Sequence, residues 1–320
     1  MDFNTICFIL RQAVYCMIPL LVAAIGGMFS ERGGVQNMAL EGLMIIGAFC
    51  GTYFIRIMQV RGFSGQWVLI LALLIGGLAG LLLSLLHAFA CINMHAHQVI
   101  SGIAINLLAP ALCIIVAKAT LGVLQVGYTN TFRVMEVPGL SKIPLLGQVL
   151  FTKTYLTTLV GFLVWAAALF VLYRTRFGMR LRACGENPHA ADSVGVNVYR
   201  YRYKGVMISG FLCGLAGVTW VIPNATEFGA AVGGYGFLAL AVLCFGQWKP
   251  NRILFASFFF ALFKTVSYVY TGIPLLLNSG INSYIFKMVP YIATVLVLAI
   301  FSDKSGEPAA LGKIYIKNGK

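Results

Sequence analysis

Long apolar runs separated by short polar stretches dominate the chain. Taking about 20 residues for each membrane-spanning helix, the pattern predicts about nine such helices, within a range of eight to ten. The expected segments are residues 12–29, 35–55, 66–92, 98–119, 154–173, 205–223, 233–247, 252–271 and 288–302. We therefore expect an all-α polytopic membrane protein that forms a single transmembrane domain over residues 1–320.

Composition supports the membrane class and excludes others. The chain is 60% hydrophobic and 10% charged, far from the balance of a soluble domain. Its formal net charge is +14, but the basic residues flank the apolar runs and do not form one aromatic-studded face, so we expect no nucleic-acid partner. The cysteines show no CxxC pair and no His/Cys ligand spacing, which argues against a disulfide framework and against a metal site.

One long charged segment interrupts the apolar pattern, from Arg174 to Lys204. Basic residues far outnumber the acidic residues Glu186 and Asp192 in it, so the positive-inside bias places it in the cytoplasm. An odd number of spans then puts the N-terminus outside and the C-terminal tail inside. Its arginines would also meet anionic membrane lipid at the inner surface.

The centre of this segment reads as a short capped helix. Asn187 suits the N-cap, Pro188 the first helical position, and Gly195 the left-handed residue that ends a helix. A helix of about two turns is too short to persist alone in water. The segment is either a solvated loop or a docking helix whose small residues, Ala190 and Ala191, enter a groove on a cytosolic partner.

Two stretches break the membrane pattern and predict broken helices. The second apolar segment begins with Gln36–Gly42, which includes Glu41, and an acidic side chain near the bilayer centre costs about 2.5–3.5 kcal/mol unless it is paired or wet. The seventh is preceded by the glycine-rich stretch Pro223–Gly236. Non-helical backbone at this depth must line a cavity or be buried in protein. The flanks of the two breaks resemble each other weakly, which is either chance or the trace of an inverted repeat.

Polar residues at the two breaks and in the fourth segment are candidates for a substrate path. Asn37 is expected one helical turn before Glu41 on the same face. Ser101, Gly102 and Asn106 form a second polar strip that serves either ligand contact or helix packing, and Glu41 itself could serve structure alone. The candidate path residues are Asn37, Glu41, Ser101, Asn106, Glu227 and Tyr235. A further face, Ser209 to Gly217, carries small residues at four-residue spacing and predicts close helix packing.

No phosphate-binding GxxxxGK[ST] pattern occurs and no catalytic cluster is expected. Any ATPase would have to be another chain. Two other function classes remain for comparison: a stand-alone secondary transporter driven by an ion gradient, and a membrane-embedded enzyme. The nine acidic residues are scattered along the chain, which argues against the enzyme.

Three motifs, Gly33–Met44, Gln98–Asn106 and Leu181–Asn197, carry a resemblance to a known family. The chain resembles the permease subunits of bacterial ABC importers in the branched-chain amino acid and simple-sugar superfamily. Within it, the chain looks most like the nucleoside permeases served by basic membrane lipoprotein-type binding proteins. The likeness covers nearly the whole length.

The resemblance implies import of nucleosides by alternating access through the bacterial cytoplasmic (inner) membrane, or alternatively import of a simple sugar such as ribose or galactose. It implies that the short cytoplasmic helix is a coupling helix on an ABC ATPase subunit, and that ATP and Mg belong to that subunit, with no cofactor in this chain. The expected coupling residues are Gly185, Glu186, Asn187, Pro188, Ala190, Ala191, Asp192 and Gly195. A second permease subunit, in a heterodimer or a homodimer, and an extracytoplasmic substrate-binding lipoprotein are the other implied partners.

Overall fold

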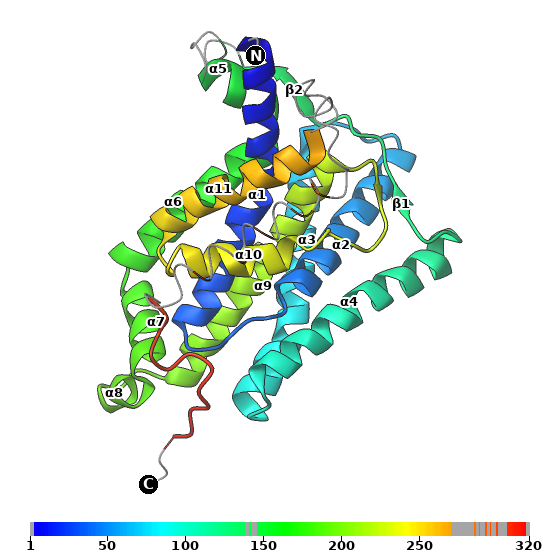
Figure 1. The fold of residues 1–320 in the computed structure, drawn as a ribbon. Coiled ribbons are helices and arrows are strands. Elements are labelled where there is room, and N and C mark those ends of the chain that lie inside the picture. The colour runs from blue at the N-terminus through cyan, green and yellow to red at the C-terminus, as the bar shows by residue number, and fades with distance from the viewer. Residues whose placement is uncertain are drawn as a thin grey trace.

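The computed structural model describes residues 3–137, 141, 146–269 and 306–317, with isolated helical positions at 285, 288, 292, 295 and 299. Helices account for most of this part of the chain (Figure 1). In chain order the elements are α1 Phe3–Arg32, α2 Leu40–Val60, α3 Gln66–Ala88, the π-helical turn η1 Phe89–Asn93, α4 Gln98–Leu121, β1 Val126–Gly127, β2 Arg133–Glu136, α5 Leu146–Leu150, β3 Thr152–Tyr155, α6 Leu156–Arg174, α7 Arg176–Glu186, α8 Pro188–Ser193, α9 Val198–Asn224, β4 Glu227–Phe228, α10 Tyr235–Phe245 and α11 Pro250–Val269.

The predicted all-α polytopic class is confirmed, but the number of spans is not. Seven helices of the described chain are long and apolar enough to cross a membrane: α1, α2, α3 with η1, α4, α6, α9 and α11. The segment expected at 233–247 forms only α10, an apolar helix of 11 residues, because the glycine-rich stretch before it stays non-helical. The segment expected at 288–302 lies outside the described residues except at four isolated helical positions.

Helix α9 begins earlier than predicted, and the charged segment contains a further helix, α7. Asn197 accepts a hydrogen bond from the backbone N–H of Arg200 (3.1 Å) and caps α9, which begins at Val198, seven residues before the apolar run expected from residue 205. Thr175 caps α7 in the same way, through the N–H of Gly178 (3.2 Å). Much of the charged segment 174–204 is therefore helical, because side-chain caps satisfy the first backbone donors of each helix.

Helix α9 lies at the centre of the bundle and packs closely on α1, α2 and α3. A Cβ atom added to Gly214 would lie 2.2 Å from the carbonyl oxygen of Gly76, and one added to Gly217 would lie 2.0 Å from that of Met44. Such contacts require glycine, since any side chain would separate the helices. The predicted packing face from Ser209 to Gly217 is confirmed.

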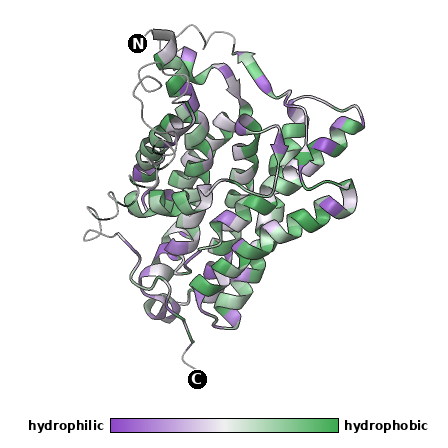
Figure 2. Cartoon of the chain, turned by 45° about the vertical axis from the view of Figure 1, so that its right-hand side comes forward, coloured by the Kyte–Doolittle hydropathy of each residue, from purple (hydrophilic) through white to green (hydrophobic). Residues whose placement is uncertain are grey.

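The molecule has two distinct ends. The N-terminus, α5 and β2 lie at one end, and α7, α8 and the C-terminal residues 306–317 lie at the other, which we call the α8 end (Figure 1). Hydrophobic residues dominate the middle of the long helices, while hydrophilic residues gather at the ends (Figure 2). The turns at Arg32, Asn93 and Trp248 lie at the α8 end: Arg32 contacts Glu186 and Trp248, and Asn93 accepts from Tyr203 near the start of α9.

The long connection from Leu121 to Lys153 contains strands that form short antiparallel pairs. Strand β1 pairs with β4, with Val126 opposite Phe228, and β2 pairs with β3. The β1–β4 pair joins the end of α4 to the glycine-rich stretch after α9. This fixes the entry of the chain into the second break.

Candidate functional site

The α8 helix forms as the sequence predicts. The side chain of Asn187 accepts a hydrogen bond from the backbone N–H of Ala190 (3.0 Å), and Pro188 occupies the first turn. Gly195 has a φ of +81°, the left-handed conformation that glycine adopts without strain. Because of these local signals, α7 ends at Glu186 and the next residues form a separate helix of six residues, α8.

The two alanines of α8 face in different directions. Ala191 is buried in a small cluster with Cys184, Val198 and Tyr315, while Ala190 is exposed. Successive residues of a helix lie about 100° apart around its axis, so both cannot lie on one face. Of the two, only Ala190 can meet a partner, and Ala191 anchors the helix to the body of the protein.

The outer side of α8 and of the turn after it is open. His189, Ala190 and Ser193 are exposed, and the side chain of Val194 is 77% exposed. An apolar side chain this exposed at a polar end of the molecule is a candidate contact for another protein.

The C-terminal segment 306–317 holds α8 from the other side. The N–H of Ala310 donates to the carbonyl oxygen of Gly185 (2.9 Å), and the Tyr315 ring lies 5.1 Å from the His189 ring, centre to centre. Lys317 pairs with Asp192 at 3.8 Å. Sequence reasoning missed this contact and took the tail only as a basic cytoplasmic end. The available signal was the apolar run Ile314-Tyr315-Ile316 in a basic tail, of which Tyr315 is buried and both isoleucines are exposed.

Burial at this site also changes the chemistry of Cys184. Its side chain is fully buried beneath α8, and burial raises the pKa of the thiol to about 11. The nearby Arg202 acts in the opposite direction and lowers that pKa. Because burial dominates, Cys184 stays a neutral thiol under physiological conditions.

A second polar centre lies where α2 and α10 begin. The N–H of Gly234 donates to one carboxylate oxygen of Glu41 (2.9 Å), and the N–H of Gly236 donates to the other (2.6 Å). A Cβ added to Gly236 would lie 2.3 Å from the backbone nitrogen of Glu41, so the two helix starts touch. A carboxylate stabilises the partly positive N-terminus of a helix, and this one serves a helix far away in the sequence.

Asn37 does not lie on the Glu41 helix, contrary to prediction, because α2 begins only at Leu40. The buried side chain of Asn37 accepts from the N–H of Ala39 (3.0 Å) and donates to the Ser209 hydroxyl (2.8 Å). The side chain therefore satisfies a turn of irregular backbone, which is a common use of asparagine.

The polar strip of α4 packs against the same irregular stretch. Asn106 donates to the carbonyl oxygen of Met38 (2.8 Å) and accepts from the N–H of Gly42 (2.8 Å). Ser101 hydrogen bonds to His87 (3.0 Å). These residues satisfy buried backbone and side-chain groups, as the packing interpretation expects, and their contact with a substrate stays a prediction.

The two remaining candidate path residues, Tyr235 and Glu227, lie in different parts of the structure. Tyr235 is fully buried at the start of α10 beside Glu41's two glycine partners, while Glu227 is exposed in β4 and pairs with Gly127 of β1. Lys264 is a buried charged residue within α11. In the structure its ammonium group lies 3.5 Å from the carbonyl oxygen of Gly233 and 5.3 Å from the centre of the Tyr235 ring. The bundle thus brings Glu41, Tyr235 and Lys264 to one region and leaves Glu227 elsewhere.

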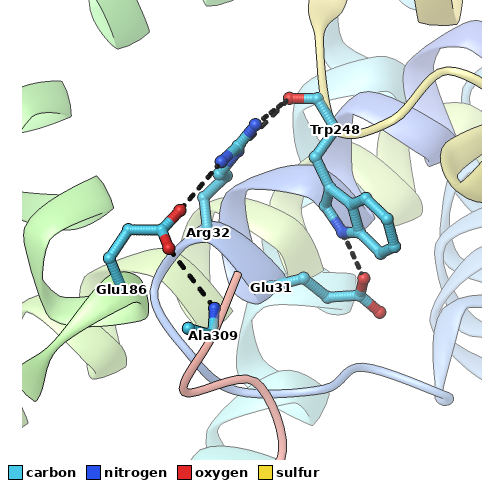
Figure 3. Close-up of polar contacts among 5 residues, drawn as sticks. All are labelled: Glu31, Arg32, Glu186, Trp248 and Ala309. Carbon is cyan, nitrogen blue, oxygen red and sulfur yellow. Dashed lines mark hydrogen bonds and ion pairs between the residues drawn. The ribbon is translucent and has the colours of Figure 1, made fainter. Parts of the chain in front are cut away.

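A third polar cluster lies between the end of α7 and the turn after α10 (Figure 3). The Arg32 guanidinium lies between Glu186 at the end of α7 and the carbonyl oxygen of Trp248 after α10, at 3.5 Å and 3.1 Å. The Trp248 indole N–H donates to Glu31 (2.6 Å), and the Ala309 N–H donates to Glu186 (3.4 Å). Sequence reasoning did not single out Arg32, because an arginine at the end of a span is common.

A bundle of apolar helices with broken helices inside and a capped helix at one end is the architecture of a polytopic membrane protein. Over residues 9–298 the chain matches the family model described as branched-chain amino acid transport system / permease component. The chain therefore belongs to this family.

Its relatives include proteins named as transport subunits. It is 39% identical over 316 residues to the nucleoside ABC transporter permease protein NupC of Lactococcus lactis, covering 98% of both chains. It is 41% identical over 302 residues to the guanosine permease NupQ of Bacillus subtilis, covering 93% of both. It is 32% identical over 320 residues to a putative glucose ABC transporter permease, TsgC13 of Haloferax volcanii, with 91% of this chain and 90% of that protein aligned. No solved structure matches the chain.

Proposed function

We propose that this chain is the membrane permease subunit of an ATP-driven importer for nucleosides. Family membership supports the ABC transport machine, and the nucleoside and guanosine permeases among its relatives support the substrate class. The hydrolysis of ATP would belong to a separate subunit. Nucleosides would cross the bilayer by alternating access between the two ends of the bundle.

The observation that carries the coupling role is the presentation of α8. The helix is anchored through Ala191 and the C-terminal segment, and it offers Ala190 and Val194 outward. A rigid, exposed short helix at one end of a membrane bundle can insert into a groove of a soluble ATPase subunit. The coupling surface would consist of residues 185–195.

This role orients the chain. The α8 end would face the cytoplasm, in agreement with the excess of basic residues in segment 174–204, and the N-terminal end would face outward. A substrate-binding lipoprotein would deliver nucleosides at the outer end. A second permease subunit, either a related chain or a second copy, would complete the path.

The path itself would pass the junction of α2 and α10. Glu41 and Tyr235 are buried polar groups at the starts of α2 and α10, and Lys264, within α11, is a buried charged group beside Tyr235. Transporters place substrate sites at such interrupted helices. Asn37, Ser101 and Asn106 hold the irregular backbone next to it. Glu227, in β4, would instead lie at the outer entrance.

A simple sugar is the second candidate substrate, favoured by the putative glucose permease among the relatives. Uptake of labelled guanosine by cells that express this chain with its ATPase, second permease and lipoprotein separates the two. We expect uptake that unlabelled adenosine or uridine reduces and that ribose and glucose leave unchanged. Competition by sugars alone would assign the machine to sugars, and uptake by this chain without the ATPase would indicate a stand-alone transporter.

A further inference from the structure

Arg32 joins the α8 end to the turn after α10 through one side chain. Its guanidinium group donates twice to the carbonyl oxygen of Trp248, from Nη2 (3.1 Å) and Nε (3.3 Å), and once to Glu186 (3.5 Å). The three residues lie side by side in Figure 3, with Arg32 in the middle. We call Arg32, Glu186 and Trp248 the Arg32 junction.

The two sides of the junction differ in strength. The Arg32 side chain is 12% exposed and that of Glu186 is 53% exposed, so water screens their ion pair. The bonds to Trp248 are charge-assisted and nearly buried, which makes them the stronger attachment. Arg32 is therefore bound strongly to the turn after α10 and weakly to Glu186 at the end of α7.

On the side of Glu186, where the ion pair is weak, close backbone packing joins the end of α7 to the end of α1. A Cβ added to Gly185 would lie 2.3 Å from the carbonyl oxygen of Arg32, so the end of α7 rests directly on the end of α1. A displacement of the coupling segment toward the membrane must move Arg32 or break this contact. The ion pair with Glu186 then keeps the guanidinium aligned.

The turn after α10 is fixed from a second side. Trp248 has a φ of +53°, its side chain is buried, and its indole N–H donates to Glu31, the neighbour of Arg32. Two consecutive residues of α1 thus hold one turn. Because α10 spans only 11 residues, or about 16 Å at 1.5 Å per residue, a shift of this turn reaches its other end as a rigid-body motion.

The start of α10 contacts the start of α2 through Glu41, Gly234 and Gly236, which we call the Glu41 junction. The start of α10 is fastened by the two hydrogen bonds from Gly234 and Gly236 to the Glu41 carboxylate. The stretch from Glu31 to Glu41 therefore contacts α10 at both ends. Glu31 and Arg32 bind Trp248 after the end of α10, and Glu41 binds the backbone at its start. A motion at the α8 end would change how α2 and α10 meet in the centre of the bundle.

We infer that Arg32 is the positioning residue that passes movement of the coupling helix to α10 and through it to the Glu41 junction. The inference rests on the proposed function, because it requires an ATPase to move α8. Arg32 touches neither nucleotide nor substrate in this role. Arg32 couples the hydrolysis of ATP to the opening of the substrate path.

The test is the number of ATP molecules hydrolysed for each nucleoside imported, measured on the complete four-component complex in proteoliposomes. Arg32→Gln removes the charge and the forked donors, and Arg200→Gln is the matched control, since Arg200 is exposed at the same end. We expect Arg32→Gln to raise the ratio about tenfold, the usual effect of losing charge-assisted bonds. Arg200→Gln should leave it unchanged, and Arg32→Lys should restore it in part.

Glu186→Gln is the second variant, a conservative change at a half-exposed side chain, and co-purification of the ATPase subunit checks that docking on residues 185–195 is kept. The substitution removes the screened ion pair with Arg32 and keeps an oxygen acceptor for the Ala309 N–H, and we expect the ratio to rise about twofold. Uptake and hydrolysis that fall in proportion in Arg32→Gln, or an unchanged ratio in both variants, would overturn the inference and leave Arg32 a structural residue. Absence of ATP-driven uptake in the wild type would overturn the proposed function, and this inference with it.

Discussion

The carboxylate of Glu41, in the first turn of α2, accepts a 2.6 Å hydrogen bond from the backbone N–H of Gly236, 195 positions later in the first turn of α10. Two helix starts thus share one acidic side chain in the middle of the bundle. Because each helix start is partly positive, the carboxylate stabilises both. This contact joins the two breaks that the sequence shows in its membrane pattern.

Replacing Glu41 with glutamine should weaken this junction. Glutamine keeps the shape but has one acceptor oxygen for two N–H donors, and it lacks the charge. We expect the loss of about 1.5–3 kcal/mol, the value of a hydrogen bond to a charged group, and a clear fall in uptake. Thermal unfolding of the purified chain and uptake assays measure both effects. Glu136→Gln, on exposed strand β2, is the control, and equal behaviour of the two variants would contradict the account.

The close approach of α2 and α10 depends on Gly236. Alanine at this position would place its Cβ 2.3 Å from the Glu41 nitrogen, so the helices must separate. We expect Gly236→Ala to destabilise the protein by about 1–3 kcal/mol, as overpacking does, and to reduce uptake. Gly229→Ala is the matched control, because its nearest neighbour atom would lie 3.4 Å away on the Gln125 side chain. A fully active Gly236→Ala variant would show that the contact can relax.

The opposite orientations of Ala190 and Ala191 predict opposite effects of the same substitution. Ala190→Trp adds a bulky group on the exposed side of α8, so we expect normal stability but loss of ATPase binding. Ala191→Trp adds it inside the buried cluster, so we expect destabilisation of about 1–3 kcal/mol. Co-purification of the ATPase subunit and thermal unfolding separate the two outcomes. ATPase binding by Ala190→Trp at the wild-type level would move the docking surface elsewhere.

Thiol labelling tests the packing beneath α8. Burial raises the pKa of Cys184 to about 11, so at pH 8 about one thiol in a thousand is the reactive thiolate. That fraction grows only as the pH rises toward this pKa. We expect maleimide to spare Cys184 at pH 8 and to label Val194→Cys quickly, as mass spectrometry of the labelled peptides would show.

The ATPase subunit should protect Val194→Cys from labelling and leave Cys184 as it was. Fast labelling of Cys184 in the isolated permease would contradict the buried cluster of Ala191, Val198 and Tyr315. Labelling of Val194→Cys at an equal rate with and without the ATPase would place the partner away from α8.

Local signals in the sequence predicted the features that depend on neighbouring residues, namely the long apolar helices and the capped helix α8. The apolar runs located the seven long helices, and Asn187, Pro188 and Gly195 located α8, because caps and turns act within a few positions. Glycine-rich Pro223–Gly236 correctly marked a broken helix. The start of α2 was predicted five residues too early, because apolar composition cannot show where hydrogen bonds to Asn106 replace those of a helix.

Contacts between distant segments could not be predicted in this way. The pairing of Glu41 with the α10 start, of Arg32 with Trp248, and of Tyr315 with His189 each joins residues far apart in the chain. Their positions follow from the packing of the whole bundle. A single sequence marks such residues only as polar groups in apolar surroundings, which is why Glu41 stood out and Arg32 did not.

The most direct test of the account is uptake of labelled guanosine into proteoliposomes that contain this chain, its ATPase, a second permease and the binding lipoprotein. ATP is supplied only on the side of the ATPase. The account predicts uptake that requires ATP, falls when unlabelled nucleosides compete, and ceases when Ala190→Trp prevents docking on α8. Uptake of guanosine by this chain without ATP and without the ATPase would contradict it.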